Sequence, residues 1–170
     1  MVNIVFVGIP GSGKTTVGKL LANKLGRDFF DSDHVIEEQT GKIVADIFTQ
    51  DGEPHFRELE AAAIKDLLQK DHAVISLGGG ALTNDVTRAL VKEQYVIWLT
   101  AGLAQTVARI GLNRNRPLLL GNVRGQLSTL MEAREPFYKE VVTRTIDTTE
   151  LLPEQVVAAI IDQLNDDEDS

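Results

Sequence analysis

The sequence predicts an α/β fold, in which helices cover both faces of a parallel β-sheet. Short apolar runs of strand type alternate with longer segments of helical spacing along the chain. This alternation is typical of a parallel sheet with helical crossovers. Internal repeats and linkers rich in Pro, Gly or Ser are absent. We therefore expect one three-layer domain over residues 1–164, with a five-stranded parallel sheet.

The composition is that of a soluble globular protein, with 170 residues, 43% hydrophobic and 25% charged. No apolar run approaches the roughly 18 residues of a membrane span, and no leader pattern precedes the first strand. Cysteine is absent, which excludes disulfides and thiolate metal sites. The net charge of −8 argues against an extended nucleic-acid surface. We expect a cytoplasmic monomer without nucleic-acid or membrane partners.

The chain opens with a strand and an amphipathic helix. Asn3–Val7 is a short β-rich apolar run, which indicates a buried strand. Lys14–Leu25 has apolar residues at helical spacing and is followed by Gly26, a typical C-terminal cap. A second strand is expected at residues 29–30, directly before Asp31.

Three helices are expected between the second and third strands. Ser32 can cap a helix over residues 33–39, which Gly41 closes. Ile43–Thr49 is a short amphipathic segment. Glu53–Gln69 is a long helical segment with a proline in its first turn.

The second half continues the alternation. The expected elements are a strand at 73–77, a helix at 84–92, a strand at 95–99, a helix at 103–112, a basic loop at 113–122, a helix at 123–142, a strand at 144–147 and a helix at 153–164. Pro136 is expected to kink or break its helix. The acidic residues 165–170 are expected to form a disordered tail.

The segment GIPGSGKT, residues 8–15, has the spacing of a phosphate-binding loop. It lies between an expected strand and an expected helix, as that motif requires. Its glycines allow backbone N–H groups to point inward, and the helix N-terminus favours an anion. Lys14 would reach the β- and γ-phosphates, and the Thr15 hydroxyl would ligate Mg²⁺. A glycine-rich turn with a surface lysine is disfavoured because the match is complete.

Two other classes of nucleotide-binding protein lack support. A switch GTPase needs D-x-x-G, yet no aspartate here has glycine three places on. The Asn23-Lys24 pair lies within the first helix and does not form a base-reading N-K-x-D motif. A motor-type ATPase needs an acidic pair after an apolar strand, but the third strand ends in glycines and the fourth in threonine.

Two carboxylates follow the second strand instead. Asp31 and Asp33 are two residues apart, so an extended segment directs both to one side. The carboxyl ends of the strands face the ligand crevice of an open α/β sheet. One carboxylate can serve Mg²⁺ and the other can accept a hydroxyl proton. Alternatively, both are helix-capping aspartates, and the pair alone does not decide between these readings.

Four arginines are candidates for binding anions: Arg57, Arg109, Arg116 and Arg134. A guanidinium can donate two parallel hydrogen bonds to a carboxylate or a phosphate. Each arginine alone is more typical of a solvated surface. Their importance depends on whether the fold brings them together.

Together these motifs resemble the shikimate kinase family over nearly the whole chain, from Val2 to about Leu164. The family pattern corresponds here to GIPGSGKT, DSD, DGEPHFRELE, SLGGGA, RPLL and REPFY. The resemblance implies a P-loop kinase fold like that of nucleoside monophosphate kinases, with a mobile lid over residues 113–124. It also implies ATP-dependent phosphorylation of the shikimate 3-hydroxyl, a step toward chorismate and the aromatic amino acids.

The resemblance assigns the substrate site residue by residue. Asp33 would hold the acceptor hydroxyl and act as the base. Arg57 and Arg134 would clamp the shikimate carboxylate. Gly79 would offer its backbone N–H, where a side chain would block close approach.

The resemblance also assigns the nucleotide and metal sites. The expected ATP-binding residues are Gly11, Ser12, Gly13, Lys14, Thr15, Thr16, Arg109 and Arg116. Lys14 and Arg116 would neutralise the transferring phosphoryl group, Arg109 would stack on adenine, and Thr15 and Asp31 would hold Mg²⁺. The lid would exclude water, which otherwise hydrolyses ATP. Glu150 stands where some members of the family carry a basic residue near adenine, so backbone contacts are expected there.

Two alternatives remain at this point. A related kinase acting on another hydroxy acid, such as gluconate, would need the same arginine clamp. A catalytically silent nucleotide-binding domain is a second possibility, although silent relatives usually lose such groups as Lys14, Thr15, Asp33 and Arg57.

Overall fold

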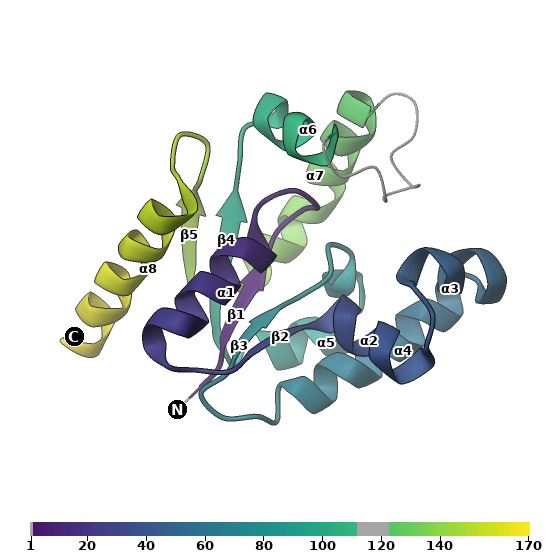
Figure 1. Cartoon of the computed structure of the whole chain (residues 1–170), viewed down its shortest axis with the longest axis horizontal. Coiled ribbons are helices and arrows are strands. Elements are labelled where there is room, and N and C mark those ends of the chain that lie inside the picture. Colours follow the sequence, from purple (N-terminus) through teal and green to yellow (C-terminus); the bar gives the residue numbers. More distant parts are fainter. Residues whose placement is uncertain (1, 112–122) are drawn as a thin grey trace.

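A computed structural model of the protein describes residues 2–111 and 123–170 and contains a five-stranded parallel sheet (Figure 1). The strands are β1 (Ile4–Val7), β2 (Phe29–Asp31), β3 (Val74–Ser76), β4 (Tyr95–Thr100) and β5 (Arg144–Asp147). Their order across the sheet is β2-β3-β1-β4-β5, and each neighbouring pair is parallel. The predicted sheet is confirmed. Strand β1, which leads into the phosphate loop, lies at its centre.

The helices lie close to their predicted positions. They are α1 (Lys14–Leu25), α2 (Ser32–Thr40), α3 (Val44–Asp51), α4 (Glu53–Leu67), the 3₁₀ helix η1 (Ala81–Thr83), α5 (Asp85–Val91), α6 (Leu103–Gly111), α7 (Val123–Val141) and α8 (Pro153–Glu168). Gly26 and Gly41 end α1 and α2 in the left-handed conformation, as expected. Within the described residues, none of the helices is long and apolar enough to cross a bilayer.

The alternation of side chains along β1 separates two layers of core. Ile4 and Phe6 face the helices α1 and α8, and pack with residues such as Leu21. Val5 and Val7 face the opposite side, where α4, α5 and α7 cover the sheet. Successive residues of a strand point to opposite faces, so a strand buried on both sides reads as a continuous apolar run. The result is three layers, with the sheet in the middle (Figure 1).

Helices α2, α3 and α4 form a smaller unit at the β2 edge of the sheet (Figure 1). Their shared core contains Ile36, Ile47, Phe56 and Ala63, all buried. This unit matters for the site because α2 carries Asp33 and α4 carries other candidate residues toward the carboxyl edge of the sheet.

Two expectations about α7 and α8 need correction. Helix α7 continues through Pro136, so the expected break is absent, while the alternative of a kink stays a prediction. Leu127 before the proline and Tyr138 and Val141 after it all pack into the core. Helix α8 extends to Glu168, so residues 165–168 are helical instead of disordered.

The extension of α8 has a visible cause in its contacts with the sheet. The carboxylate of Asp167 accepts a hydrogen bond from the Tyr95 hydroxyl at 2.5 Å and pairs with the Arg144 guanidinium. These contacts join the last turns of α8 to β4 and β5. The run of like charges in the sequence suggested mutual repulsion, but it did not indicate that Asp167 would pair with residues of two strands.

Candidate functional site

The phosphate loop between β1 and α1 depends on glycine for its backbone shape. Gly11 and Gly13 have φ of 81° and 95°, which other residues rarely adopt. Space is also limited, because a Cβ on Gly8 would lie 2.7 Å from the Leu99 carbonyl oxygen. A Cβ on Gly11 would lie 2.9 Å from Ile110 Cγ1. The loop therefore follows the backbone path that its motif predicts.

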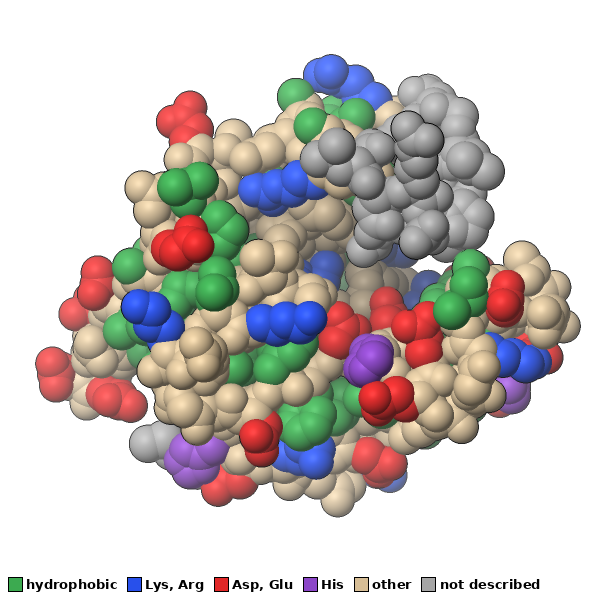
Figure 2. Space-filling view, viewed as in Figure 1, with side chains coloured by type: hydrophobic (Ala, Val, Ile, Leu, Met, Phe, Trp, Pro, Cys, Tyr) green, Lys and Arg blue, Asp and Glu red, His purple; other side chains and the backbone are tan. Residues whose placement is uncertain are grey.

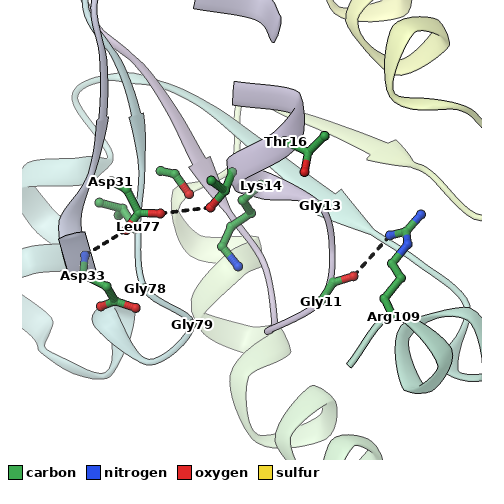
Figure 3. Close-up of a pocket in the computed structure, with 12 residues that line it drawn as sticks. Gly11, Gly13, Lys14, Thr16, Asp31, Asp33, Leu77, Gly78, Gly79 and Arg109 are labelled. Atoms are coloured by element: carbon green, nitrogen blue, oxygen red, sulfur yellow. Dashed lines mark hydrogen bonds between the residues drawn. The ribbon is translucent and has the colours of Figure 1, made fainter. Parts of the chain in front are cut away.

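Two cationic side chains lie against this loop. Lys14 is 8% exposed, and its Nζ donates to the carbonyl oxygens of Gly8 at 2.7 Å and Ile9 at 3.0 Å. Arg109, from α6, donates from Nη1 to the Gly11 carbonyl oxygen at 3.2 Å. Figure 3 shows Lys14 between Asp33 on one side of the cavity and Arg109 on the other. Positive charge is thus concentrated at the loop of an otherwise acidic protein.

Asp31 connects the phosphate loop to helix α2. Its Oδ2 accepts a hydrogen bond from the Thr15 hydroxyl at 2.9 Å. Its Oδ1 accepts from the backbone N–H of Asp33 at 2.9 Å and of His34 at 3.3 Å, so Asp31 is the N-cap of α2. The expectation that Ser32 caps this helix is wrong, because the Ser32 hydroxyl accepts from the Gly78 N–H instead.

The three glycines after β3, residues 78–80, form the meeting point of three predicted substrate residues. A Cβ on Gly78 would lie 2.6 Å from Asp33 Oδ1. One on Gly79 would lie 3.1 Å from Arg134 Nη1, and one on Gly80 would overlap the guanidinium of Arg57. The three side chains come from α2, α7 and α4, and the absence of three consecutive Cβ atoms lets all of them approach the same stretch of backbone.

Arg57 is held in place by neighbours on α3 and α4. Its Nη1 donates to Glu60 Oε1 at 2.7 Å, and its Nε lies 3.5 Å from Glu53 Oε1. Its guanidinium carbon lies 5.8 Å from the ring centre of Phe48 and 5.3 Å from that of Phe56. Cation–π contacts of this kind orient a guanidinium plane.

Glu60 is a site residue that the sequence analysis missed. Its side chain is 4% exposed, and burial raises its pKa to about 7 although the nearby Arg57 guanidinium acts in the opposite direction. The charges of Asp33 and Arg134 also act on it, which places it among the predicted substrate residues. The spacing of three residues after Arg57 on a helix was the available signal, since such pairs lie side by side.

A cavity of about 290 Å³ lies at the carboxyl edge of the sheet. Its lining residues are Gly11, Gly13, Lys14, Thr15, Thr16, Asp31, Asp33, Ser76, Leu77, Gly78, Gly79 and Arg109. Figure 2 shows the corresponding hollow between α1 and the α2–α4 unit, with Lys or Arg side chains inside it and acidic side chains at its edge. The phosphate loop thus shares one space with Asp33, Gly78 and Gly79, whereas Arg57 and Arg134 are not among the residues that line it.

The remaining predicted residues have different outcomes. Ser12 is buried within the loop, where its N–H donates to the Ile9 carbonyl oxygen at 3.2 Å. Arg116 and residues 113–122 of the expected lid lie outside the described residues. Arg124, at the expected end of the lid, is exposed at the start of α7.

The donor set beside the loop fits Mg²⁺. The Thr15 hydroxyl and the Asp31 carboxylate, 2.9 Å apart, offer hard oxygen ligands at the position where terminal phosphates would lie. Mg²⁺ typically binds through one or two protein oxygens and completes its shell with waters and substrate phosphates. Among the described residues, no group of three or more His, Asp or Glu side chains could hold a metal ion.

Comparison with known proteins agrees with this geometry. The family model described as "Shikimate kinase" matches residues 10–165. A shikimate kinase of Thermobifida fusca is 44% identical over 94% of this chain and 93% of its own length. One of Saccharopolyspora erythraea is 45% identical over 96% of this chain and 94% of its own length. The chain belongs to the shikimate kinase family.

Solved structures of the family share the fold. A shikimate kinase from Acinetobacter baumannii in complex with shikimate superimposes with a TM-score of 0.94 and 36% identity, covering 98% of this chain and 94% of that one. The enzyme from Aquifex aeolicus gives a TM-score of 0.85 at 30% identity, with 98% of both chains covered. The predicted P-loop kinase fold, like that of nucleoside monophosphate kinases, is confirmed.

Proposed function

We propose that this protein transfers the γ-phosphoryl group of ATP to the 3-hydroxyl of shikimate, giving shikimate 3-phosphate and ADP. The observation that carries the proposal is the arrangement around residues 78–80, where an acid and two arginines meet beside a phosphate loop. Such a site suits a small acceptor that carries a hydroxyl at one end and a carboxylate at the other. A relative of known fold binds shikimate.

The carboxylate of the acceptor is assigned to Arg57 and Arg134. Both guanidiniums approach the glycines from different helices, so they can donate to a carboxylate from two directions. Glu60 keeps its bond to one nitrogen of Arg57, which leaves other N–H groups of that fork for the substrate. The backbone N–H of Gly79 is assigned as a further donor.

The hydroxyl of the acceptor is assigned to Asp33. The Asp33 carboxylate accepts the hydroxyl proton as the acceptor oxygen forms its bond to the γ-phosphorus. The bond between that phosphorus and the oxygen bridging to the β-phosphate breaks, and ADP leaves with the electron pair. The cap of α2 and the Ser32 contact with Gly78 hold Asp33 at the cavity.

The nucleotide is assigned to the phosphate loop, residues 11–16, with Arg109 on the adenine side. Lys14 and Arg116 neutralise the phosphoryl group during transfer, because this chemistry depends mainly on positioning and charge. Bound Mg²⁺ would neutralise charge on the β- and γ-phosphates. Thr15 and Asp31 would hold it, directly or through water.

The experiment that tests this proposal is an ADP-release assay with ATP and Mg²⁺, comparing shikimate, gluconate and no acceptor. We expect ADP release when shikimate is the acceptor, but not with gluconate or without an acceptor. We also expect this turnover to be lost when EDTA removes the metal. Turnover with gluconate but not with shikimate would support the related hydroxy-acid kinase instead. Nucleotide binding without turnover on either acid would indicate a silent domain.

The assembly state, the cellular location and the partners of the protein are also proposed. We expect a monomer in the cytoplasm, with ATP and shikimate as its partners. Size-exclusion chromatography with light scattering, with and without ATP, measures the assembly state directly.

A further inference from the structure

Tyr138 lies between two groups that the proposed function assigns to the substrate carboxylate. Its side chain belongs to α7 and is buried, and its hydroxyl donates a hydrogen bond to the Gly79 carbonyl oxygen at 3.3 Å. The guanidinium of Arg134, four residues earlier on α7, lies beside the same glycine, since a Cβ on Gly79 would be 3.1 Å from its Nη1, and it lowers the pKa of the Tyr138 hydroxyl against the effect of burial. The hydroxyl therefore lies where a substrate arginine meets the backbone of the three glycines.

The ring of Tyr138 is itself fixed to the sheet. It packs against Trp98 of β4, with ring centres 5.3 Å apart and an angle of 34° between the planes. Trp98 pairs in register with Val7, the last residue of β1 before the phosphate loop. The position of the tyrosine hydroxyl is thus defined relative to the strand that presents the nucleotide site.

The Tyr138 hydroxyl is suited to be a hydrogen-bond donor that stays protonated. Burial raises the pKa of Tyr138 to about 12, although the charge of Arg134 acts in the opposite direction. The hydroxyl therefore keeps its proton at neutral pH. It can donate to the Gly79 carbonyl while its oxygen accepts from Arg134.

We infer that Tyr138 is a positioning residue for the acceptor's carboxylate, acting through Arg134 and through the peptide between Gly79 and Gly80. Consecutive glycines have wide backbone freedom. Because a peptide unit is planar and this one is trans, holding the Gly79 carbonyl fixes the peptide that follows Gly79 and so limits the backbone freedom of the residue whose N–H is assigned to the substrate. The inference rests on the proposed function, since that function supplies the carboxylate.

Replacement of Tyr138 by phenylalanine tests the inference with little change in packing. Y138F keeps the ring against Trp98 and removes only the hydroxyl. Loss of a hydrogen bond that orients charged or buried groups is typically worth about a tenfold change in affinity. We expect the KM for shikimate to rise about tenfold on that basis, while the KM for ATP and kcat stay within about twofold.

The chain offers a matched control in its other tyrosine. Tyr95 also has a hydrogen-bonded hydroxyl, which donates to Asp167 at 2.5 Å. It stands at the amino end of β4, on the sheet edge opposite the site. Y95F should lower the thermal stability without raising the KM for shikimate. An equal rise of the KM for shikimate in Y138F and Y95F would indicate a general effect of losing a hydroxyl and would overturn the inference.

A second readout does not depend on turnover. Trp98, the chain's single tryptophan, contacts the Tyr138 ring, so its fluorescence can report binding of shikimate and of its uncharged methyl ester without ATP. We expect Y138F to weaken binding of the acid but not of the ester. Equal weakening of both would indicate simple structural damage, and unchanged binding of both would also overturn the inference.

These outcomes separate the inference from the proposed function. If the unaltered protein binds shikimate but does not phosphorylate it, the proposed reaction fails, and the comparison of acid with ester still tests Tyr138. If Y138F does not fold, an NMR titration of the unaltered protein replaces it. The amide signals of Gly79 and Gly80 should shift with shikimate more than with the ester, and equal shifts would overturn the inference.

Discussion

The Ser32 hydroxyl accepts a hydrogen bond from the backbone N–H of Gly78 at 2.9 Å, across 46 residues of sequence. Ser32 is fully buried and immediately precedes Asp33. The bond continues the pairing of β2 with β3 beyond its last register pair, Asp31 with Ser76. The first turn of α2 is thereby attached to the glycines against which Asp33 lies.

Replacing Ser32 by alanine should therefore impair phosphoryl transfer, although Ser32 has no assigned contact with either substrate. The Gly78 N–H would lose its partner, at a cost of about 1–3 kcal/mol if it stays buried. We expect S32A to lower the melting temperature and kcat, with the Kd for ATP unchanged. Calorimetry and steady-state kinetics measure both effects. A kcat equal to that of the unaltered enzyme would show that this bond does not position Asp33.

Replacing Asp33 by asparagine removes the proposed base and keeps the size of the side chain. General base catalysis typically contributes about 10²- to 10⁴-fold, so we expect kcat to fall at least about 100-fold on that estimate. Nucleotide binding should persist, because the phosphate loop is unaltered. Rapid-quench kinetics and ATP titration check the two statements. Turnover near the normal rate would remove Asp33 from its assigned role.

A methyl group on Gly80 should displace Arg57, because the Cβ would overlap its guanidinium. The φ of Gly80 is −104°, so alanine causes no backbone strain there. We expect G80A to raise the KM for shikimate about 10- to 100-fold, the range for a lost charge-assisted hydrogen bond, and R57A to do the same. The KM for ATP should change little in both variants.

Gly26 provides the control for this substitution. It has a positive φ of 66°, and nothing lies within 4 Å of an added Cβ. G26A should cost stability, since alanine disfavours that conformation, but it should not change the KM for shikimate. If G26A raised this KM as much as G80A does, the effect could not be assigned to Arg57.

The raised pKa of Glu60 predicts a dependence of stability on pH. The folded-state pKa of about 7 lies above the ordinary value of 4.5, so folding favours the protonated acid. Its contribution to stability is present at low pH and is lost as the pH rises through about 7. Between about pH 5.5 and about pH 8, we expect the unaltered protein to lose about 2 kcal/mol relative to E60Q.

Urea denaturation of both proteins at several pH values measures this difference. Glutamine mimics the protonated acid, so the two curves should converge below about pH 4.5, separate as the pH rises to about 7 and keep a constant difference above it. Curves that stay parallel over the whole pH range would mean that the Arg57 guanidinium cancels the rise in pKa that burial of Glu60 causes.

The fold and much of the site were predictable because they depend on local pattern. Apolar runs identified the strands, and the carboxyl ends of parallel strands share one edge. That rule brings the phosphate loop, Asp31, Asp33 and the glycines of residues 78–80 together without further information. Arg57 and Arg134 were found through motif resemblance, since helical periodicity gives the face of a residue but not its partner.

What the sequence could not show were single contacts between distant segments. The bond of Ser32 to Gly78, that of Tyr138 to Gly79 and the attachment of Asp167 to β4 and β5 each join residues whose meeting depends on how helices pack. Charge composition alone also gave a wrong prediction for the last turns of α8. It indicates repulsion between like charges along the chain, but not the attraction of Asp167 to residues of β4 and β5.

In the proposed complex, one molecule of shikimate spans the three glycines, with its carboxylate on the arginines and its hydroxyl on the acid beside the phosphate loop. A crystal structure of the protein with shikimate and ADP tests this most directly. We expect the carboxylate within hydrogen-bonding distance of Arg57 and Arg134, and the 3-hydroxyl within that distance of Asp33. Shikimate bound in the reverse orientation, or outside this cavity, would contradict it.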